Sequence, residues 1–205
     1  MADVAVVRPG SEGILKSFVR NVNGKYHRAA LWAFMAIVVA HWAEHLFQAF
    51  QIWALGWERP DARGVLGLAF PWLVSSESLH YFYAIVMLAG LLLLRPGFTG
   101  RSRSWWNLAL GIQFWHHIEH AVLLGQAVVG ANLFANEIPM SLVQLAFPTM
   151  RVELHLFYNA VVFVPMVIAM IMHTHPIEDE LHEVTCTCAA ASRRELAAAG
   201  SGAGG

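Results

Sequence analysis

The chain has 205 residues, of which 57% are hydrophobic and only 13% are charged, and its mean hydropathy is +0.50. This is more apolar sequence than the core of a soluble domain of this size needs, so the composition favours a membrane protein. The formal net charge of -1 and the lack of a run of basic residues predict no nucleic-acid partner.

Four stretches are apolar over about the 20 residues that a helix needs to cross the hydrocarbon core of a membrane. In chain order, they run roughly from Ala29 to Leu55, from Ser78 to Leu94, from Trp105 to Gly130 and from Val152 to Met172. We therefore expect an all-α fold, an integral membrane four-helix bundle whose main partner is the lipid bilayer.

Basic residues indicate which ends of the spans face the cytoplasm. They lie ahead of the first span, and residues 1–27 are predicted to be a cytoplasmic N-terminal segment. No short apolar run with a small-residue cleavage site is found there, so we expect no cleavable signal peptide. Basic residues recur between the second and third spans and in the tail at Arg193 and Arg194, so the positive-inside rule predicts a multi-pass protein of the cell membrane with both termini cytoplasmic. The basic residues on which this prediction rests are Lys16, Arg20, Lys25, Arg28, Arg95, Arg101, Arg103, Arg193 and Arg194.

The tail at 176–205 ends in a stretch rich in Ala, Gly and Ser, from Ala189 to Gly205, which is typical of a flexible segment. Its Cys186 and Cys188, with His173, His175 and His182 before or beside them, could hold a soft metal, but a disordered cytoplasmic tail is the favoured interpretation.

The chain repeats itself at an offset of 75 residues. We expect residues 28–175 to consist of two tandem two-helix units, at about 28–100 and 103–175, related by a pseudo-two-fold axis along the membrane normal. The matched pairs are Arg28 and Arg103, His41 and His116, Glu44 and Glu119, His45 and His120, Gln51 and Gln126, Leu79 and Leu154, His80 and His155, Phe82 and Phe157, and Tyr83 and Tyr158.

Histidines and glutamates share helix faces within these spans. His41, Glu44, His45 and Gln48 are spaced i, i+3, i+4 and i+7, and the third span repeats the first three of these positions. The two units also place these histidines at the same depth in the membrane. His41 lies 13 residues after Arg28 and His116 lies 13 residues after Arg103, which is about 20 Å along a helix in each case. We predict one metal site with the ligands His41, Glu44, His45, Glu77, His80, His116, Glu119, His120 and His155.

Neighbouring residues are expected to contribute less directly. Gln48, Tyr83 and Tyr158 lie one turn from histidines and are predicted to contact the cofactor or its ligands. His117 lies off the shared face, and Glu153 points nearly opposite to His155, so neither is predicted as a ligand.

Imidazoles with carboxylates suit a transition metal, for which we expect iron, with copper or zinc as further candidates. The predicted function is a non-heme, dimetal oxidoreductase acting on a hydrophobic small molecule that enters between the helices. A b-type heme protein for electron transfer and a metal or proton carrier stay open as alternatives. The sequence also leaves open whether the chain is an enzyme, which residues are catalytic and whether it works in a larger membrane complex.

The segments HWAEH at 41–45 and HHIEH at 116–120 resemble two histidine boxes of membrane fatty-acid hydroxylases and desaturases. The resemblance covers only these two segments. A third histidine box is missing, so the chain is not assigned to that family.

Overall fold

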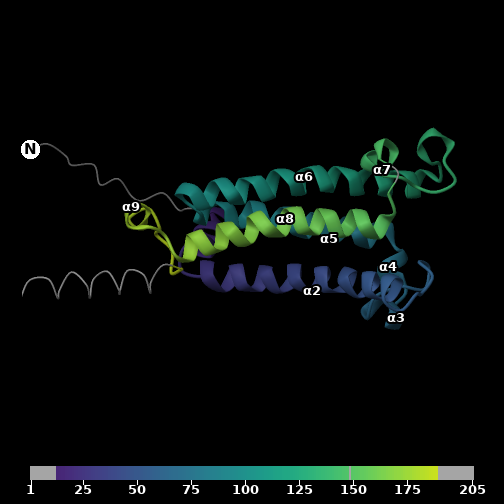
Figure 1. Cartoon of the computed structure of the whole chain (residues 1–205). Helices are drawn as coiled ribbons and strands as arrows, with labels where there is room; N and C mark the ends of the chain where they lie inside the picture. Colours follow the sequence, from purple (N-terminus) through teal and green to yellow (C-terminus); the bar gives the residue numbers. More distant parts are fainter. Residues whose placement is uncertain (1–12, 148, 189–205) are drawn as a thin grey trace, which may run out of the picture.

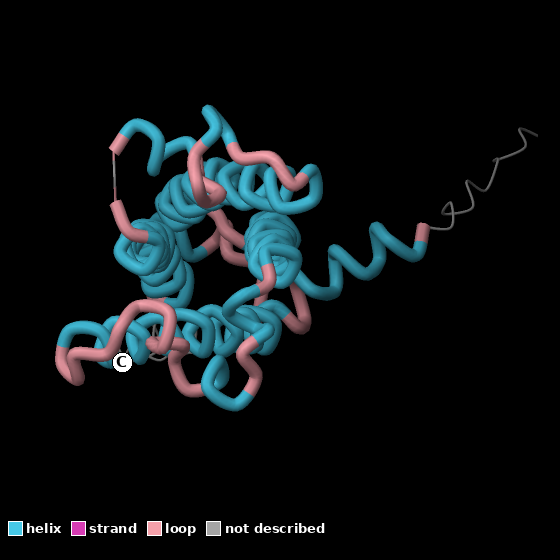
Figure 2. The backbone as a smooth tube through the Cα atoms, turned by 90° about the vertical axis from the view of Figure 1, so that its right-hand side faces the viewer, coloured by secondary structure: helices cyan, strands magenta, loops and turns pink. Residues whose placement is uncertain are grey.

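The computed structural model describes residues 13–147 and 149–188, and every regular element in them is a helix, with no strand. Four helices are long: α2 (His27–Trp53), α5 (Glu77–Leu94), α6 (Gly100–Val129) and α8 (Arg151–Thr174). They lie alongside one another (Figure 1). Helix α6 contacts α5 and α8, and α2 contacts α8 and α5, so the four surround a common interior (Figure 2).

The shorter elements lie at the two ends of these helices. Helices α3 (Leu66–Ala69), α4 (Trp72–Ser75) and α7 (Leu142–Ala146) lie together at one end, which we call the loop end (Figure 1). The opposite, terminal end is formed by the start of α2, the end of α8 and the turn η1 (Arg95–Gly97). Helix α1 (Ile14–Asn23) precedes α2, η2 (Leu133–Ala135) follows α6, and α9 (Glu178–Leu181) follows α8.

Among the described residues, three helices are long and apolar enough to cross a membrane: α2, α5 extended through Gly97, and α8. The fourth expected span, in α6, does not meet that description although α6 is the longest helix. Its middle turns carry several polar side chains, which lower its hydropathy. They include Asn107, Gln113, His116, His117, Glu119 and His120.

The outer surface of the long helices is strongly apolar. Large apolar side chains point outward from all four, including those of α6. Exposed apolar surface on this scale is unusual in a soluble protein and is what lipid contact requires. Examples are Trp32, Phe47, Phe82, Leu92, Leu108, Phe114, Phe157 and Ile171.

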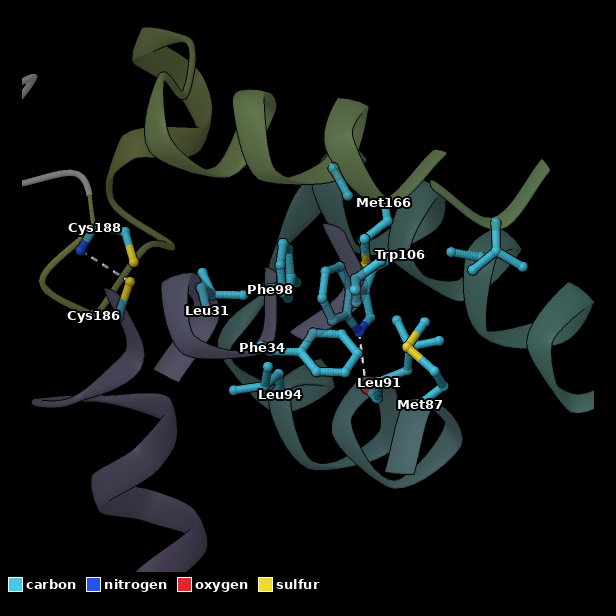
Figure 3. Packing of buried hydrophobic residues seen from close by; sticks show 14 of the residues in the cluster. Leu31, Phe34, Met87, Leu91, Leu94, Phe98, Trp106, Met166, Cys186 and Cys188 are labelled. Atoms are coloured by element: carbon cyan, nitrogen blue, oxygen red, sulfur yellow. Dashed lines mark hydrogen bonds between the residues drawn. The ribbon is translucent and has the colours of Figure 1, made fainter. Parts of the chain in front are cut away.

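The apolar core fills the half of the interior toward the terminal end (Figure 3). Trp106 of α6 is at its centre with no exposed surface, and its indole N–H donates a hydrogen bond to the carbonyl oxygen of Leu91 at 2.8 Å. Its ring stacks on Phe98, with 4.1 Å between centroids. Aromatic packing therefore joins α6 to α5 and to the turn that follows α5.

Some residues after α8 are buried, although that segment was predicted to be a flexible tail. Val184, Cys186 and Cys188 are buried and belong to the same apolar core. The segment expected to be flexible is thus partly packed, since these three side chains are buried while Thr185 and Thr187 between them are exposed. Residues 189–205, which include the predicted Ala-, Gly- and Ser-rich end with Arg193 and Arg194, lie outside the described residues.

Candidate metal centre

Six histidine side chains from the four long helices meet in the interior, on the loop-end side of the apolar core. We call them the histidine layer: His41, His45, His80, His116, His120 and His155. Centroid distances between rings of different helices are 5.0 Å for His45 and His155, 5.3 Å for His120 and His155, and 6.2 Å for His80 and His120. The structure therefore brings all six predicted histidines together.

Two pairs in the histidine layer have the spacing of ligands to one ion. The Nε2 atoms of His41 and His45 are 3.1 Å apart, and those of His116 and His120 are 3.2 Å apart. Two imidazole nitrogens bonded at about 2.0–2.1 Å to one ion lie about 2.9–3.4 Å apart, depending on the angle between the bonds. One further histidine joins the second pair, since ligand atoms of His116, His120 and His155 all lie within 4.8 Å of one another.

Hydrogen bonds at Nδ1 orient three of the six rings. The Nδ1 atom of His45 lies 2.7 Å from Gln48 Oε1, that of His80 lies 2.9 Å from the Ser76 carbonyl oxygen, and that of His155 lies 2.8 Å from the Arg151 carbonyl oxygen. These acceptors require the hydrogen on Nδ1, which leaves the Nε2 lone pair for a metal. Gln48 thus contacts the site through His45.

Several buried polar atoms of this region have no hydrogen-bond partner among the described residues. They are His116 Nδ1, His120 Nδ1, His155 Nε2, Glu119 Oε2, Tyr83 Oη and Asn159 Nδ2. Buried polar atoms are almost always paired in folded proteins, so an ordered water or a bound ion is expected to satisfy some of this group. A cavity of about 10 Å³ lies among His41, His80, His116 and His120, with Tyr83 and Asn159 in its wall. That volume is roughly what one water molecule or ion needs.

Glu44 of α2 and Glu119 of α6 both form hydrogen bonds with the backbone at the loop end. Glu44 Oε1 accepts a hydrogen bond from the Gly67 N–H at 2.9 Å, and Glu119 Oε1 accepts one from the Val143 N–H at 2.8 Å. Glu119 Oε2 has no hydrogen-bond partner among the described residues and borders a small cavity that His116, His120 and His155 also line. Each glutamate therefore fastens a loop, and Glu119 also offers an oxygen to the histidine layer.

A glycine substitution tests how closely Glu44 is held. Gly64 has a φ of +74° and a Cβ there would collide with the Glu44 carboxylate, whereas Gly56, with a φ of +69°, has open space around it. Alanine at either position costs about 1–2 kcal/mol for the left-handed backbone. We expect Gly64→Ala to lower the free energy of unfolding in detergent beyond the loss in Gly56→Ala. Equal losses would show that Glu44 moves aside freely.

Two further glutamates near the loop end form ion pairs with arginines. Glu77, a predicted ligand, forms an ion pair with Arg151. Glu153, which was not predicted as a ligand, binds Arg59 through both oxygens at 2.8 and 3.0 Å. His117 stacks on Tyr81, with 5.1 Å between centroids, and lies apart from the histidine layer. In this structure the Glu77 carboxylate therefore pairs with the Arg151 guanidinium at the edge of the site.

Both predicted tyrosines stack on histidines of the site. Tyr83 lies 3.6 Å from His41 between ring centroids, and Tyr158 lies 4.2 Å from His116. The Tyr158 hydroxyl accepts a hydrogen bond from Trp115 Nε1 at 3.0 Å, whereas the Tyr83 hydroxyl is buried without a partner. The two phenols thus occupy matching places beneath the two histidine pairs.

Substitution by phenylalanine separates stacking from hydrogen bonding at these tyrosines. Tyr83→Phe and Tyr158→Phe keep the ring, so we expect fold and metal content to be retained, with a loss of about 1 kcal/mol for the Trp115 contact in the second variant only. If the histidine layer holds a metal, its optical spectrum should shift, because the phenols would orient its surroundings. An unchanged spectrum in the double variant would assign both tyrosines to packing.

A larger pocket leads from the loop end to the histidine layer. Its volume is about 640 Å³, within the range of about 300–1,000 Å³ that holds small molecules. His45, His80 and His155 line it together with apolar side chains and with Arg59 and Arg151. The apolar residues are Pro60, Ala62, Val74, Ile138, Pro139, Met140, Met150 and Val152. The pocket therefore reaches these three histidines from the loop end.

A second group of ligand-type side chains lies at the terminal end. His27, His173, Cys186 and Cys188 are all buried, and their ligand atoms lie within 4.8 Å of one another. Hydrogen bonding from Cys188 and His173 holds the pKa of the Cys186 thiol well below its usual range. The sequence pointed to His173 and the Cys-x-Cys pair but not to His27, which lies 146 residues before His173.

Comparison of the chain with protein-family models, with curated proteins and with solved structures found no match.

Proposed function

We propose that residues 28–175 form an integral membrane four-helix bundle of two tandem two-helix units, with α6 as the fourth span and both termini cytoplasmic. Matched contacts at matched positions support the repeat. Gln51 binds the backbone of Gly64 through its amide oxygen and nitrogen, and Gln126 binds Met140 in the same way. The contacts of Glu44 with Gly67 and of Glu119 with Val143 form a second such pair.

The function that the site supports best is a membrane metalloprotein, a non-heme dimetal oxidoreductase. The observation that carries this proposal is the pair of His-x-x-x-His contacts, with Nε2 separations of 3.1 and 3.2 Å, inside one layer of six histidines. One ion per pair, completed by His80 and His155, uses every imidazole of the layer. Iron suits imidazole with an added carboxylate from Glu119, and copper or zinc would use the same nitrogens.

The pocket at the loop end supports a hydrophobic substrate. Apolar side chains form about half of its wall, and three histidines of the layer line it. We propose that a lipid-soluble molecule binds there and is oxidised by dioxygen, so that the electrons and protons lost by the substrate reduce the oxygen. Metal ions held by the histidine layer would supply the redox chemistry. Arg59 and Arg151 at the rim orient polar groups of the substrate.

The packing between the histidine layer and the terminal end argues against a metal or proton carrier. Between the histidine layer and the terminal end, the core is filled by side chains such as Val38, Met87, Leu91, Trp106 and Met166. A proton or ion path needs a chain of polar groups or water through the protein. The packed apolar core therefore favours a site that is reached from one side only.

Metal analysis of the full chain purified in detergent, with an optical spectrum, tests the proposal. We expect about two iron ions per chain, as in other bundle sites with paired metals, and consumption of dioxygen when a reducing lipid-soluble substrate is added. A Soret band would replace the proposal by the heme alternative. A chain that binds no transition metal at the histidine layer would overturn both.

A further inference from the structure

Three separate parts of the chain bring ligand-type side chains to the terminal end. His27 is the first residue of α2, His173 lies in the last turn of α8, and Cys186 and Cys188 follow α9. Their exposed fractions are only 0%, 1%, 3% and 6% in that order. Figure 3 shows the two cysteines beside Leu31, at the edge of the apolar core.

The imidazoles of this group are buried without the partners that burial normally requires. Both ring nitrogens of His27 and Nδ1 of His173 have no hydrogen-bond partner among the described residues. His173 Nε2 lies 3.1 Å from Cys186 Sγ, and the Cys188 N–H donates to the same sulfur at 3.3 Å. Four ligand-type side chains thus lie close together at the edge of the apolar core.

The backbone of η1 packs directly against the His27 imidazole at Gly97. Any side chain at Gly97 would collide with its imidazole, so glycine is required at that point of η1. Phe98 packs against both rings, with centroid distances of 5.5 Å to His27 and 4.7 Å to His173. This close enclosure holds the histidines in place and excludes water from them.

We propose that His27, His173, Cys186 and Cys188 bind one zinc ion in a tetrahedral site. Two sulfurs and two nitrogens in a buried set of four are the ligands of structural zinc, which leaves no position open for substrate. Ligand atoms on such an ion, at about 2.0–2.3 Å from it, lie about 3.3–3.8 Å from one another, so atoms within 4.8 Å need only small shifts.

The zinc ion fastens the segment after α8 to the start of α2. Because its four ligands come from both ends of the described domain, binding in the folded state closes a long loop and stabilises it. This role is independent of the oxidoreductase proposed above. It concerns a closed site at the opposite end of the apolar core.

Zinc content of full-length variants tests the assignment. We expect His27→Gln, His173→Gln, Cys186→Ser and Cys188→Ser each to lose one zinc ion per chain, while His175→Gln and His182→Gln, from the same region, retain it. Metal at the histidine layer should be unchanged in all six, so loss of zinc alone distinguishes this site from the proposed oxidoreductase centre. Zinc retained in the four ligand variants, or copper or iron found in its place, would overturn the proposal.

Two measurements remain informative where a ligand variant fails to fold. In the wild-type chain, iodoacetamide should modify Cys186 and Cys188 only after a zinc chelator is added. Cobalt exchanged for zinc should give the visible bands of a tetrahedral ion and a thiolate charge-transfer band, and Cys188→His should keep the visible bands with about half of the charge-transfer intensity. Equal modification with and without chelator, or a cobalt spectrum without thiolate, would contradict a zinc site here.

Discussion

Substitution of His45 or His120 by alanine is expected to remove about half of the metal bound at the histidine layer, by the same amount in both variants. The two residues hold matching positions, since each Nε2 faces the Nε2 of a histidine four residues earlier. Each variant should therefore lose one of two ions. Metal per chain is measured on detergent-purified protein whose size and helix content match the wild type.

His117→Ala is the matched control because it removes an imidazole from the same helix but from outside the layer. The ring of His117 stacks on Tyr81. We expect this variant to retain nearly all of its metal. Equal losses at His45, His117 and His120 would mean that the metal is held by histidine content in general rather than by the layer.

Trp106→Ala is expected to lower the free energy of unfolding by about 3–5 kcal/mol, the usual range for a fully buried large aromatic residue. The indole has no exposed surface, donates a hydrogen bond to the Leu91 carbonyl oxygen and stacks on Phe98, so alanine leaves a cavity and removes these contacts. Unfolding of the purified chain in mixed micelles of increasing denaturing-detergent content measures the loss.

Trp32→Ala provides the control for this prediction. Trp32 is 62% exposed on the outer surface of α2, so its removal leaves no interior cavity and should cost much less. If both tryptophan variants lose the same stability, contact with detergent or lipid rather than interior packing stabilises the helices.

Local periodicity explains how much of the site could be predicted from the sequence. Residues spaced by three and four share a helix face, so the placement of His41 beside His45, and of His116 beside His120, needed no knowledge of the other helices. The offset of 75 residues then indicated that both pairs lie at one depth. The all-helical structure follows from the same long apolar segments.

The choice of partner for each carboxylate could not be predicted in this way. Glu77 was expected at the metal, but it pairs with Arg151, which lies 74 residues later in the chain. The two residues meet only because α5 and α8 begin at the same end of the structure. Glu44 was likewise expected as a ligand, and one of its oxygens accepts a hydrogen bond from the loop-end backbone at Gly67.

By itself, the sequence determined that the chain is helical and apolar, and which histidines share a helix face, because these properties depend on residues within a few turns. The tertiary structure alone decided that His27 meets His173 and the two cysteines, since that contact requires the start of α2, the end of α8 and the following segment to fold together. It also decided that the histidine layer opens to the loop end, because side chains from both connecting loops form the pocket wall.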